Sequence, residues 1–341
     1  MTEQTGRHGR PRMVDVGRAA DVSAQTVSRY FTGGYVGVEA RARIEQAIED
    51  LGYRFNTAAR RLRVDRSNAV GIVSMGPQNF GVWSALGGVT EAARAAGMTV
   101  VIGQMDIEAS DVDFTAALRT ALGQLLLAGV DGVILGTPYQ GGETTGIEVL
   151  GDLPMVVLAE RPHRPTNSAH VSSYEAARLA MEHLLELGHQ RILHLGGDPE
   201  TVESEERERG YRDAMTDAGL DPLEVQQIDW TSDAGHELGQ RVDVSQFTAV
   251  FAGNDALALG FLSALRDRGL TAPDDFSIVG IDDMPESRFF APPLTTVALD
   301  FEALGREAFE MLTEIIRTGG VAGQRTIAPT LKVRRSTRTI D

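Results

Sequence analysis

The sequence predicts a small all-α unit at the N-terminus, followed by a larger α/β body with parallel doubly wound sheets. Three short amphipathic segments lie between Met13 and Leu51, whereas short apolar runs alternate with amphipathic segments from Ala69 onward. Alternation of strands and helices is typical of parallel sheets that are covered by helices. Because the chain has 341 residues, the body has room for two such lobes.

The composition excludes several classes of protein. The chain has no cysteine, which excludes disulfides, thiolate metal sites and a cysteine nucleophile. Its apolar runs are shorter than the ~18–20 residues of a membrane helix, and Met1–Arg12 is polar. We therefore expect a cytoplasmic protein.

Charge is distributed unevenly along the chain. The net charge is −16, but residues 1–66 carry twelve arginines and eight acidic residues, so this piece has a charge of +4 and the remainder −20. An acidic surface repels nucleic acid, whereas a basic one is attracted to phosphates. Only the N-terminal unit is therefore expected to bind DNA.

The N-terminal segments have the order of a helix-turn-helix domain. A short helix is predicted over Met13–Ala20, a tight turn at Asp21-Val22, and a second helix that opens at Ser23, a good N-cap. A third helix near Glu39–Leu51 repeats apolar residues at the helical spacing. Three short helices of this kind predict a helix-turn-helix domain over residues 1–54.

The second helix carries the side chains that would read bases. Glutamine pairs well with adenine and arginine with guanine in the major groove, while hydroxyl groups suit phosphates. The alternative is that these are solvated polar residues on an exposed helix. The candidate DNA-binding residues at its start and along its outer side are Ser23, Ala24, Gln25, Thr26, Ser28 and Arg29.

A short basic segment, Asn56–Arg63, joins the two parts. It begins with a capping asparagine, but a helix of two turns is marginal in water because nucleation is unfavourable. We expect it to fold only when a second copy of the chain and DNA hold it. The alternative is a disordered basic linker over residues 55–66.

In the body, apolar runs predict the strands and amphipathic runs the helices between them. The predicted strands are Ala69–Ser74, Thr99–Gly103, Gly132–Leu135, Met155–Leu158, Arg191–Leu195, Ala249–Ala252 and Ser277–Ile281. The predicted helices are near Val82–Ala96, Phe114–Leu127, Tyr174–Leu187, Glu205–Ala218, Ala256–Arg268 and Asp300–Arg317.

Polar residues follow several of these strands. Glu160, Asn254-Asp255 and Asp282-Asp283 each come shortly after a predicted strand. Ligands of parallel sheets gather at the carboxyl ends of strands. Carboxylates, an amide and a guanidinium such as Arg207 can bind neighbouring hydroxyls, while Trp or Phe covers the apolar face of a sugar ring. The alternative for each carboxylate is a strand-end cap or a surface charge.

The sequence resembles the LacI/GalR family of bacterial repressors along nearly its whole length. DVSAQTVSR and IEQAIEDLGYRFNTAARRLR match the N-terminal signature, and ELGHQRI, ERERGY, FAGNDALALG, SIVGIDD and PPLTTV match the effector domain. The resemblance implies a headpiece (1–54), a hinge helix and linker (55–66), and a two-lobed effector and dimerisation domain (67–341) of the type I periplasmic-binding-protein kind. It places lobe 1 at about 67–163 and 299–322, and lobe 2 at about 164–298 and 323–341.

The resemblance also implies roles for particular residues. Ala24, Gln25 and Arg29 fall on base-reading positions, Tyr53 on a tyrosine that contacts the DNA backbone, and Leu62 on a leucine that wedges into the minor groove. Asn56, Ala59 and Arg60 are the further hinge residues expected at DNA. The implied effector contacts are Glu160, Arg207, Trp230, Asn254, Asp282 and Phe301, with Phe80 and Trp83 as further candidates.

These features together predict a homodimeric DNA-binding repressor of carbohydrate-utilisation genes, released from a two-fold-symmetric operator by a mono- or disaccharide. We expect no cofactor, metal or enzymatic activity, because the sequence contains no GxxxxGK[ST], no GxGxxG after a strand and no HExxH. One alternative is a purine or sugar-phosphate effector, although a phosphate calls for a second cation near Arg207. Another is a sugar-binding protein without gene control.

Overall fold

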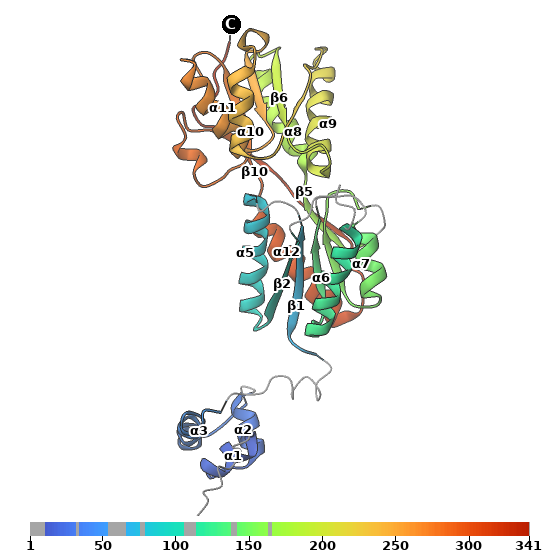
Figure 1. Cartoon of the computed structure of the whole chain (residues 1–341), viewed down its shortest axis with the longest axis vertical. Helices are drawn as coiled ribbons and strands as arrows, with labels where there is room; N and C mark the ends of the chain where they lie inside the picture. The colour runs from blue at the N-terminus through green and yellow to red at the C-terminus, as the bar shows by residue number, and fades with distance from the viewer. Residues whose placement is uncertain are drawn as a thin grey trace, which may run out of the picture. The chain divides into compact units, whose positions relative to one another are not determined.

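The computed structural model describes residues 11–31, 34–53, 66–75, 79–105, 114–137, 142–162 and 166–340. The chain divides into two compact units, Met1–Ser67 and Asn68–Asp341 (Figure 1). The segment predicted as a hinge helix, Asn56–Arg63, lies outside the described residues, and so do its candidate DNA contacts Asn56, Ala59, Arg60 and Leu62.

The N-terminal unit is the predicted helix-turn-helix, with helices α1 (Met13–Ala19), α2 (Ala24–Phe31) and α3 (Val38–Leu51). The hydroxyl of Ser23 accepts a hydrogen bond from the backbone N–H of Thr26 at 3.1 Å, as expected of an N-cap. The helices pack around one small core, which consists of Val16, Ala20, Val27, Val36, Ile44, Ala47 and Tyr53.

The turn between α1 and α2 is held by a close backbone approach. A Cβ atom on Gly17 would lie 2.9 Å from the carbonyl oxygen of Val22, so a larger residue would push the turn away. Arg43 of α3 donates to the carbonyl of Ala20 at 3.0 Å. The turn that sets the direction of α2 is therefore fixed from both sides.

The second unit consists of two lobes, each built on a six-stranded sheet (Figure 1). The first lobe has strand order β11-β5-β4-β3-β1-β2, and every pairing in it is parallel. Its helices pack in two pairs, α5 with α12 and α6 with α7. Its elements are β1 (Ala69–Met75), α5 (Phe80–Ala95), β2 (Thr99–Met105), α6 (Phe114–Ala128), β3 (Val133–Gly136), α7 (Gly142–Leu150), β4 (Met155–Leu158), β5 (Ser168–Val171), α12 (Phe301–Thr318) and β11 (Gln324–Ile327).

The second lobe has strand order β12-β10-β9-β8-β6-β7, with only the pairing of β12 to β10 antiparallel. Helices α8 and α9 pack together, and so do α10 and α11. Its elements are α8 (Ser173–Glu186), β6 (Ile192–Gly196), α9 (Val202–Asp217), β7 (Gln226–Gln227), α10 (Ser232–Arg241), β8 (Ala249–Ala252), α11 (Asp255–Asp267), β9 (Ser277–Asp282), β10 (Thr295–Ala298) and β12 (Thr330–Lys332). The predicted fold class, a helix-turn-helix followed by two lobes with parallel sheets, is confirmed.

The boundaries between the lobes differ from those expected at residues 163 and 322. Strands β5 and β11 pair with each other and, through Val157 and Ser168, extend the first sheet. The chain therefore enters the second lobe after Val171 and returns to it after Ile327. Pairing determines this placement, since β5 pairs with β4 and β11 pairs with β5. The polar sequence of β11, QRTI, carries no apolar run that would mark it as a strand.

The described helices include none that is both long enough and apolar enough to cross a membrane.

Helices α5 and α12 of the first lobe approach closely at glycines, which gives a testable prediction. A Cβ on Gly88 would lie 2.1 Å from the carbonyl oxygen of Glu302, whereas a Cβ on the neighbouring Gly87 would meet nothing within 4 Å. We expect Gly88→Ala to lower the free energy of unfolding by about 1–3 kcal/mol or more, because the helices must separate. Gly87→Ala should raise it by up to about 1 kcal/mol, because alanine favours the helix. Urea unfolding followed by circular dichroism compares them, and equal effects would contradict the packing.

Candidate functional site

A cavity of about 160 Å³ lies between the two lobes of the second unit. Its walls come from the carboxyl ends of strands in both sheets, among them Ser74, Gly136 and Leu158 of the first and Asp282 of the second. This is where parallel sheets bind ligands. Six of the eight candidate effector residues line it, namely Glu160, Arg207, Trp230, Asn254, Asp282 and Phe301.

The other two candidates, Phe80 and Trp83, are not among the lining residues. Phe80 packs edge-on against Phe301, with ring centroids 6.2 Å apart, so it supports the wall from behind. Trp83 is 52% exposed on α5. The structure thus gives neither residue the cavity position that the sequence led us to expect. Both lie on α5, where Gly81 and Val82 line the cavity instead.

Arg207 is the arginine of the described cavity lining. It lies on α9, is 5% exposed, and donates through one terminal nitrogen to the carbonyl of Gly253 at 2.6 Å. Its guanidinium carbon lies 5.0 Å from the ring centroid of Trp230, a cation–π contact. The side chain is therefore fixed in place before any ligand binds.

The indole of Trp230 is seated on two glycines. A Cβ atom would lie 2.0 Å from the ring at Gly197 and 3.1 Å from it at Gly253. Only glycine gives the ring room at position 197, so the Gly196-Gly197 turn after β6 serves to place the indole. The two glycines and Arg207 together position Trp230 at the edge of the cavity.

Asn254 lines the cavity but also holds the structure together. Its side-chain oxygen accepts from the backbone N–H of Leu257 at 2.7 Å, capping α11, and its amide nitrogen donates to the carbonyl of Trp230 at 3.1 Å. Both ends of the amide therefore have partners within the protein. Asn254 fixes the loop that carries Trp230 to the first turn of α11.

Asp282 follows β9 in an unusual backbone conformation. Its φ is 113° and that of Asp283 is 55°, values that residues other than glycine rarely adopt. Asp255 holds this turn, since its carboxylate accepts from the hydroxyl of Thr296 at 2.6 Å and from the backbone N–H of Met284 at 2.9 Å. Burial raises the pKa of Asp282 to about 7, against the opposing effect of Arg207.

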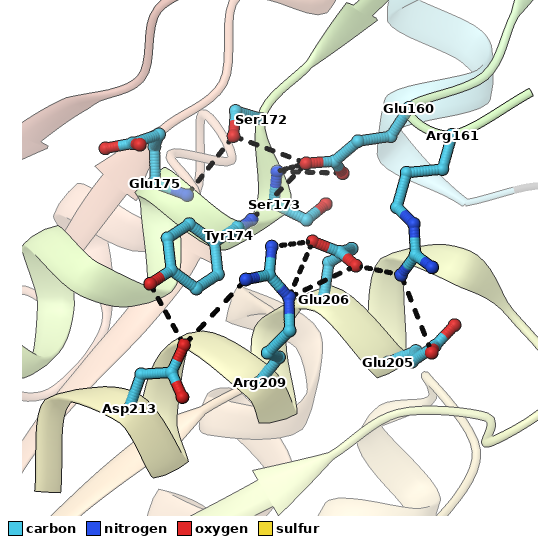
Figure 2. A network of polar contacts seen from close by, with 10 residues as sticks. All are labelled: Glu160, Arg161, Ser172, Ser173, Tyr174, Glu175, Glu205, Glu206, Arg209 and Asp213. Carbon is cyan, nitrogen blue, oxygen red and sulfur yellow. Dashed lines mark hydrogen bonds and ion pairs between the residues drawn. The ribbon is translucent and has the colours of Figure 1, made fainter. Parts of the chain in front are cut away.

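Glu160 of the first lobe binds the start of a helix in the second lobe. Its carboxylate accepts from the backbone N–H of Ser173 at 2.9 and 3.0 Å and from the hydroxyl of Ser172 at 3.3 Å (Figure 2). Carboxylates are stabilised at helix N-termini by unpaired N–H groups and the helix dipole. Glu160 thus lines the cavity as a link between the lobes, with its oxygen atoms already engaged by α8.

A cluster of charged side chains extends this link, as Figure 2 shows. Arg161, also after β4, forms ion pairs with Glu206 and, at 3.5 Å, with Glu205 of α9. The Glu206 side chain is only 2% exposed and also pairs with Arg209 at 2.5 Å. Arg209 in turn lies 3.8 Å from Asp213 and over the ring of Tyr174. Loop 159–162 of the first lobe is therefore tied to the helix that carries Arg207.

Sequence reasoning missed two ionisable residues of the cavity wall, Glu203 and His170. Glu203 lies four residues before Arg207 in α9, so helical spacing alone could have placed both on one face. Burial raises the pKa of Glu203 to about 7 and lowers that of His170 below its usual value. His170 lies on β5, a strand that no apolar run marked in the sequence.

In the N-terminal unit, the candidate base-reading side chains lie on one helix. Gln25 and Arg29 of α2 are exposed, while Ala24, Thr26 and Ser28 are partly exposed. Tyr53 is different: it is 7% exposed, and its ring packs 5.9 Å from that of Phe31 in the small core. Most of this side chain therefore supports the headpiece itself.

Comparison with known proteins decides the family. Residues 12–56 match the model of bacterial regulatory proteins of the lacI family, and residues 181–337 match a periplasmic binding protein-like domain. The HTH-type transcriptional repressor PurR of Haemophilus influenzae (strain Rd) is 30% identical over 338 residues, which cover 96% of this chain and 98% of the relative. The chain belongs to the lacI family of bacterial regulatory proteins.

Other relatives of this LacI-family regulator agree. The lactose operon repressor of Escherichia coli K12 is 29% identical over 329 residues, covering 95% of this chain and 90% of that protein. The crystal structure of the lac repressor dimer bound to operator and the anti-inducer ONPF matches with a TM-score of 0.87 and 28% identity, covering 97% of this chain and all of that one. These relatives are transcriptional repressors rather than enzymes.

Proposed function

We propose that this LacI-family regulator represses genes of carbohydrate utilisation as a homodimer and leaves its operator when a small sugar-like effector fills the cavity between the lobes. The observation that carries the proposal is the chemistry of the cavity wall. Arg207 and Asp282 offer polar groups to hydroxyls, while Val82, Leu86 and Phe301 offer apolar surface to the C–H face of a ring.

The size of the cavity favours a small effector. A cavity of about 160 Å³ has room for several water-sized groups, which suits a small molecule such as a mono- or disaccharide. A related structure, the transcriptional regulator CelR in complex with cellobiose, is 26% identical and matches with a TM-score of 0.71.

We assign the reading of operator DNA to α2 and the hinge. Gln25 and Arg29 are exposed on the same helix four residues apart, so both can enter one major groove. In segment 56–63, Leu62 is the proposed minor-groove wedge, with Asn56, Ala59 and Arg60 beside it at the DNA. Effector binding would release DNA by favouring an arrangement of the lobes that binds the operator less tightly.

A panel of mono- and disaccharides, sugar phosphates and purine bases tests the proposal. A ligand that binds the folded body raises its melting temperature, and the same ligand should release a labelled operator fragment from the full-length protein. Stabilisation by purines alone would replace the sugar with a purine and leave the regulator intact. Failure of the protein to bind any promoter fragment would refute the proposal.

Substitutions in α2 test which residues read bases. We expect Gln25→Ala and Arg29→Ala each to reduce discrimination at one operator position by ~1–3 kcal/mol, because a side chain that reads a base edge is lost. Competition binding against operators with single base changes measures this. Gln46→Ala, an exposed glutamine on α3, is the matched control and should leave discrimination unchanged. A uniform loss of affinity for all sequences would show that Gln25 and Arg29 contact phosphates instead.

A further inference from the structure

Three residues that line the cavity each have a buried polar atom without a hydrogen-bond partner in the described part of the chain. These atoms are Nδ1 of His170, Oε2 of Glu203 and Nε of Arg207. Buried polar atoms in native proteins are almost always hydrogen-bonded, and each exception calls for an explanation. Their shared position around one cavity suggests a single explanation, which is a ligand that supplies the missing partners.

The three atoms come from both lobes. His170 lies on β5 of the first lobe, where its other ring nitrogen is within 3.2 Å of the hydroxyl of Thr326. Glu203 and Arg207 lie one turn apart on α9 of the second lobe. A ligand that satisfies all three therefore contacts both lobes at once and stabilises their arrangement.

We propose that Glu203 and His170 contact the effector from opposite lobes and, together with Arg207, select an uncharged ring with several hydroxyl groups over an anionic or flat aromatic ligand. The inference rests on the proposed function, since it assumes that the cavity is the effector site. It adds two specificity-determining residues and the charge class of the ligand.

The charges around the cavity exclude an anion. Two buried carboxyl groups, Glu203 and Asp282, face a single guanidinium, Arg207, which already donates to Gly253 and lies against Trp230. In the described lining there is no second arginine or lysine. A phosphate or carboxylate would find Arg207 as its one counter-charge there, and either acid would repel it whenever that acid is ionised.

The same groups suit hydroxyls. Because burial raises the pKa of Glu203 and of Asp282 to about 7, each carboxyl can hold a proton near neutral pH and can then either donate or accept. A hydroxyl group does both as well. A flat base has less aromatic surface to stack on, because Arg207 covers one face of the Trp230 ring and Gly197 lies against the ring.

The test uses the full-length protein and a matched panel of probes: neutral aldohexoses and pentoses, 2-amino-2-deoxyhexoses, hexose 6-phosphates, and the bases adenine and hypoxanthine. We expect one or more neutral sugars to raise the melting temperature and to bind by calorimetry, and the phosphates and bases to do neither. Tighter binding of an amino sugar, a phosphate or a base, or no binding by any neutral sugar, would overturn the inference.

Variants then test the two residues. Glu203→Gln keeps a neutral group that donates and accepts, so affinity for the neutral sugar should stay within about threefold, whereas Glu203→Ala and His170→Ala should each weaken it by about tenfold or more. Glu200→Ala, an exposed glutamate just before α9, is the control and should bind like the wild type. Unchanged affinity in both Glu203→Ala and His170→Ala would overturn the inference.

Two further measurements separate the causes of failure. Operator binding without sugar should be the same in every variant, and a wild type that binds operator but responds to an anion would overturn this inference while leaving the regulator intact. A cooperative urea unfolding transition would establish that Glu203→Gln is folded.

The same unfolding measurements test the buried acid, which is faced by Arg207, Asp282, Glu160 and His170. In the folded protein Glu203 holds its proton up to about pH 7, because burial raises its pKa from the ordinary value of 4.5. The free energy of unfolding of the wild type should therefore fall relative to that of Glu203→Gln as pH rises from about 4.5 to 7.

Discussion

Arg207→Ala is expected to abolish the response to effector while leaving operator affinity unchanged. The substitution removes a hydrogen bond from a charged donor to Gly253 and the contact with Trp230, and it leaves the buried carboxyl of Asp282 without its neighbouring positive charge. Truncating one partner of a buried, hydrogen-bonded charge in a binding site costs about 2–5 kcal/mol, which corresponds to effector binding that is weaker by roughly thirtyfold or more.

Calorimetry with the sugar that binds the wild type, and anisotropy of a labelled operator, measure the two effects separately. Arg212→Ala is the matched control, because Arg212 lies five residues further along α9 and pairs with Glu208 at 2.7 Å in a half-exposed position. We expect it to behave like the wild type. An Arg207→Ala variant that is still released by sugar at wild-type concentrations would show that the effector binds elsewhere.

Arg161→Glu should produce the second large effect, by separating the lobes. The Glu206 side chain is 2% exposed and is shielded by Arg161 of the first lobe and Arg209 of its own helix. A glutamate at position 161 would face Glu205 and Glu206 with like charge. We expect the free energy of unfolding to fall by about 1–3 kcal/mol, because Glu206 is buried while Arg161 is half exposed and Arg209 still pairs with Glu206. Effector affinity should fall about tenfold, since the ligand must then also bring the lobes together.

Arg119→Glu provides the control for this charge reversal. Arg119 pairs with Glu148 within the first lobe, and both side chains are about half exposed. Exposed ion pairs contribute at most about 1 kcal/mol, so effector affinity should not change. If Arg161→Glu and Arg119→Glu lowered the melting temperature equally and left effector binding intact, Arg161 would be an ordinary surface charge.

The elements best predicted from the sequence are those whose residues are buried on both faces. Met155–Leu158 and Ala249–Ala252 are short apolar runs, and the strands β4 and β8 have these bounds. A strand in the middle of a parallel sheet is covered on both sides, so its sequence is apolar throughout. The N-terminal helices were found for a related reason, because their apolar spacing and the cap at Ser23 are local signals.

The elements that were missed depend on contacts distant in sequence. Strand β5 is only four residues long and includes His170, and helix α10 buries little besides Leu238 and two glycines. Neither shows a clear apolar period, so neighbouring elements determine their conformation. The same holds for Glu160, whose partners at the start of α8 lie twelve or more residues away. No pattern in the sequence indicates such a pairing.

Occupancy of the cavity by a small neutral sugar is expected to lower the affinity of the protein for its operator. The most direct test titrates the full-length protein on a labelled operator with the neutral sugar that gives the largest thermal shift, and compares the half-release concentration with the affinity measured by calorimetry. We expect operator affinity to fall at least tenfold as the cavity fills, and Arg207→Ala to lose both effects together. Saturation of the cavity with no change in operator affinity would contradict this expectation.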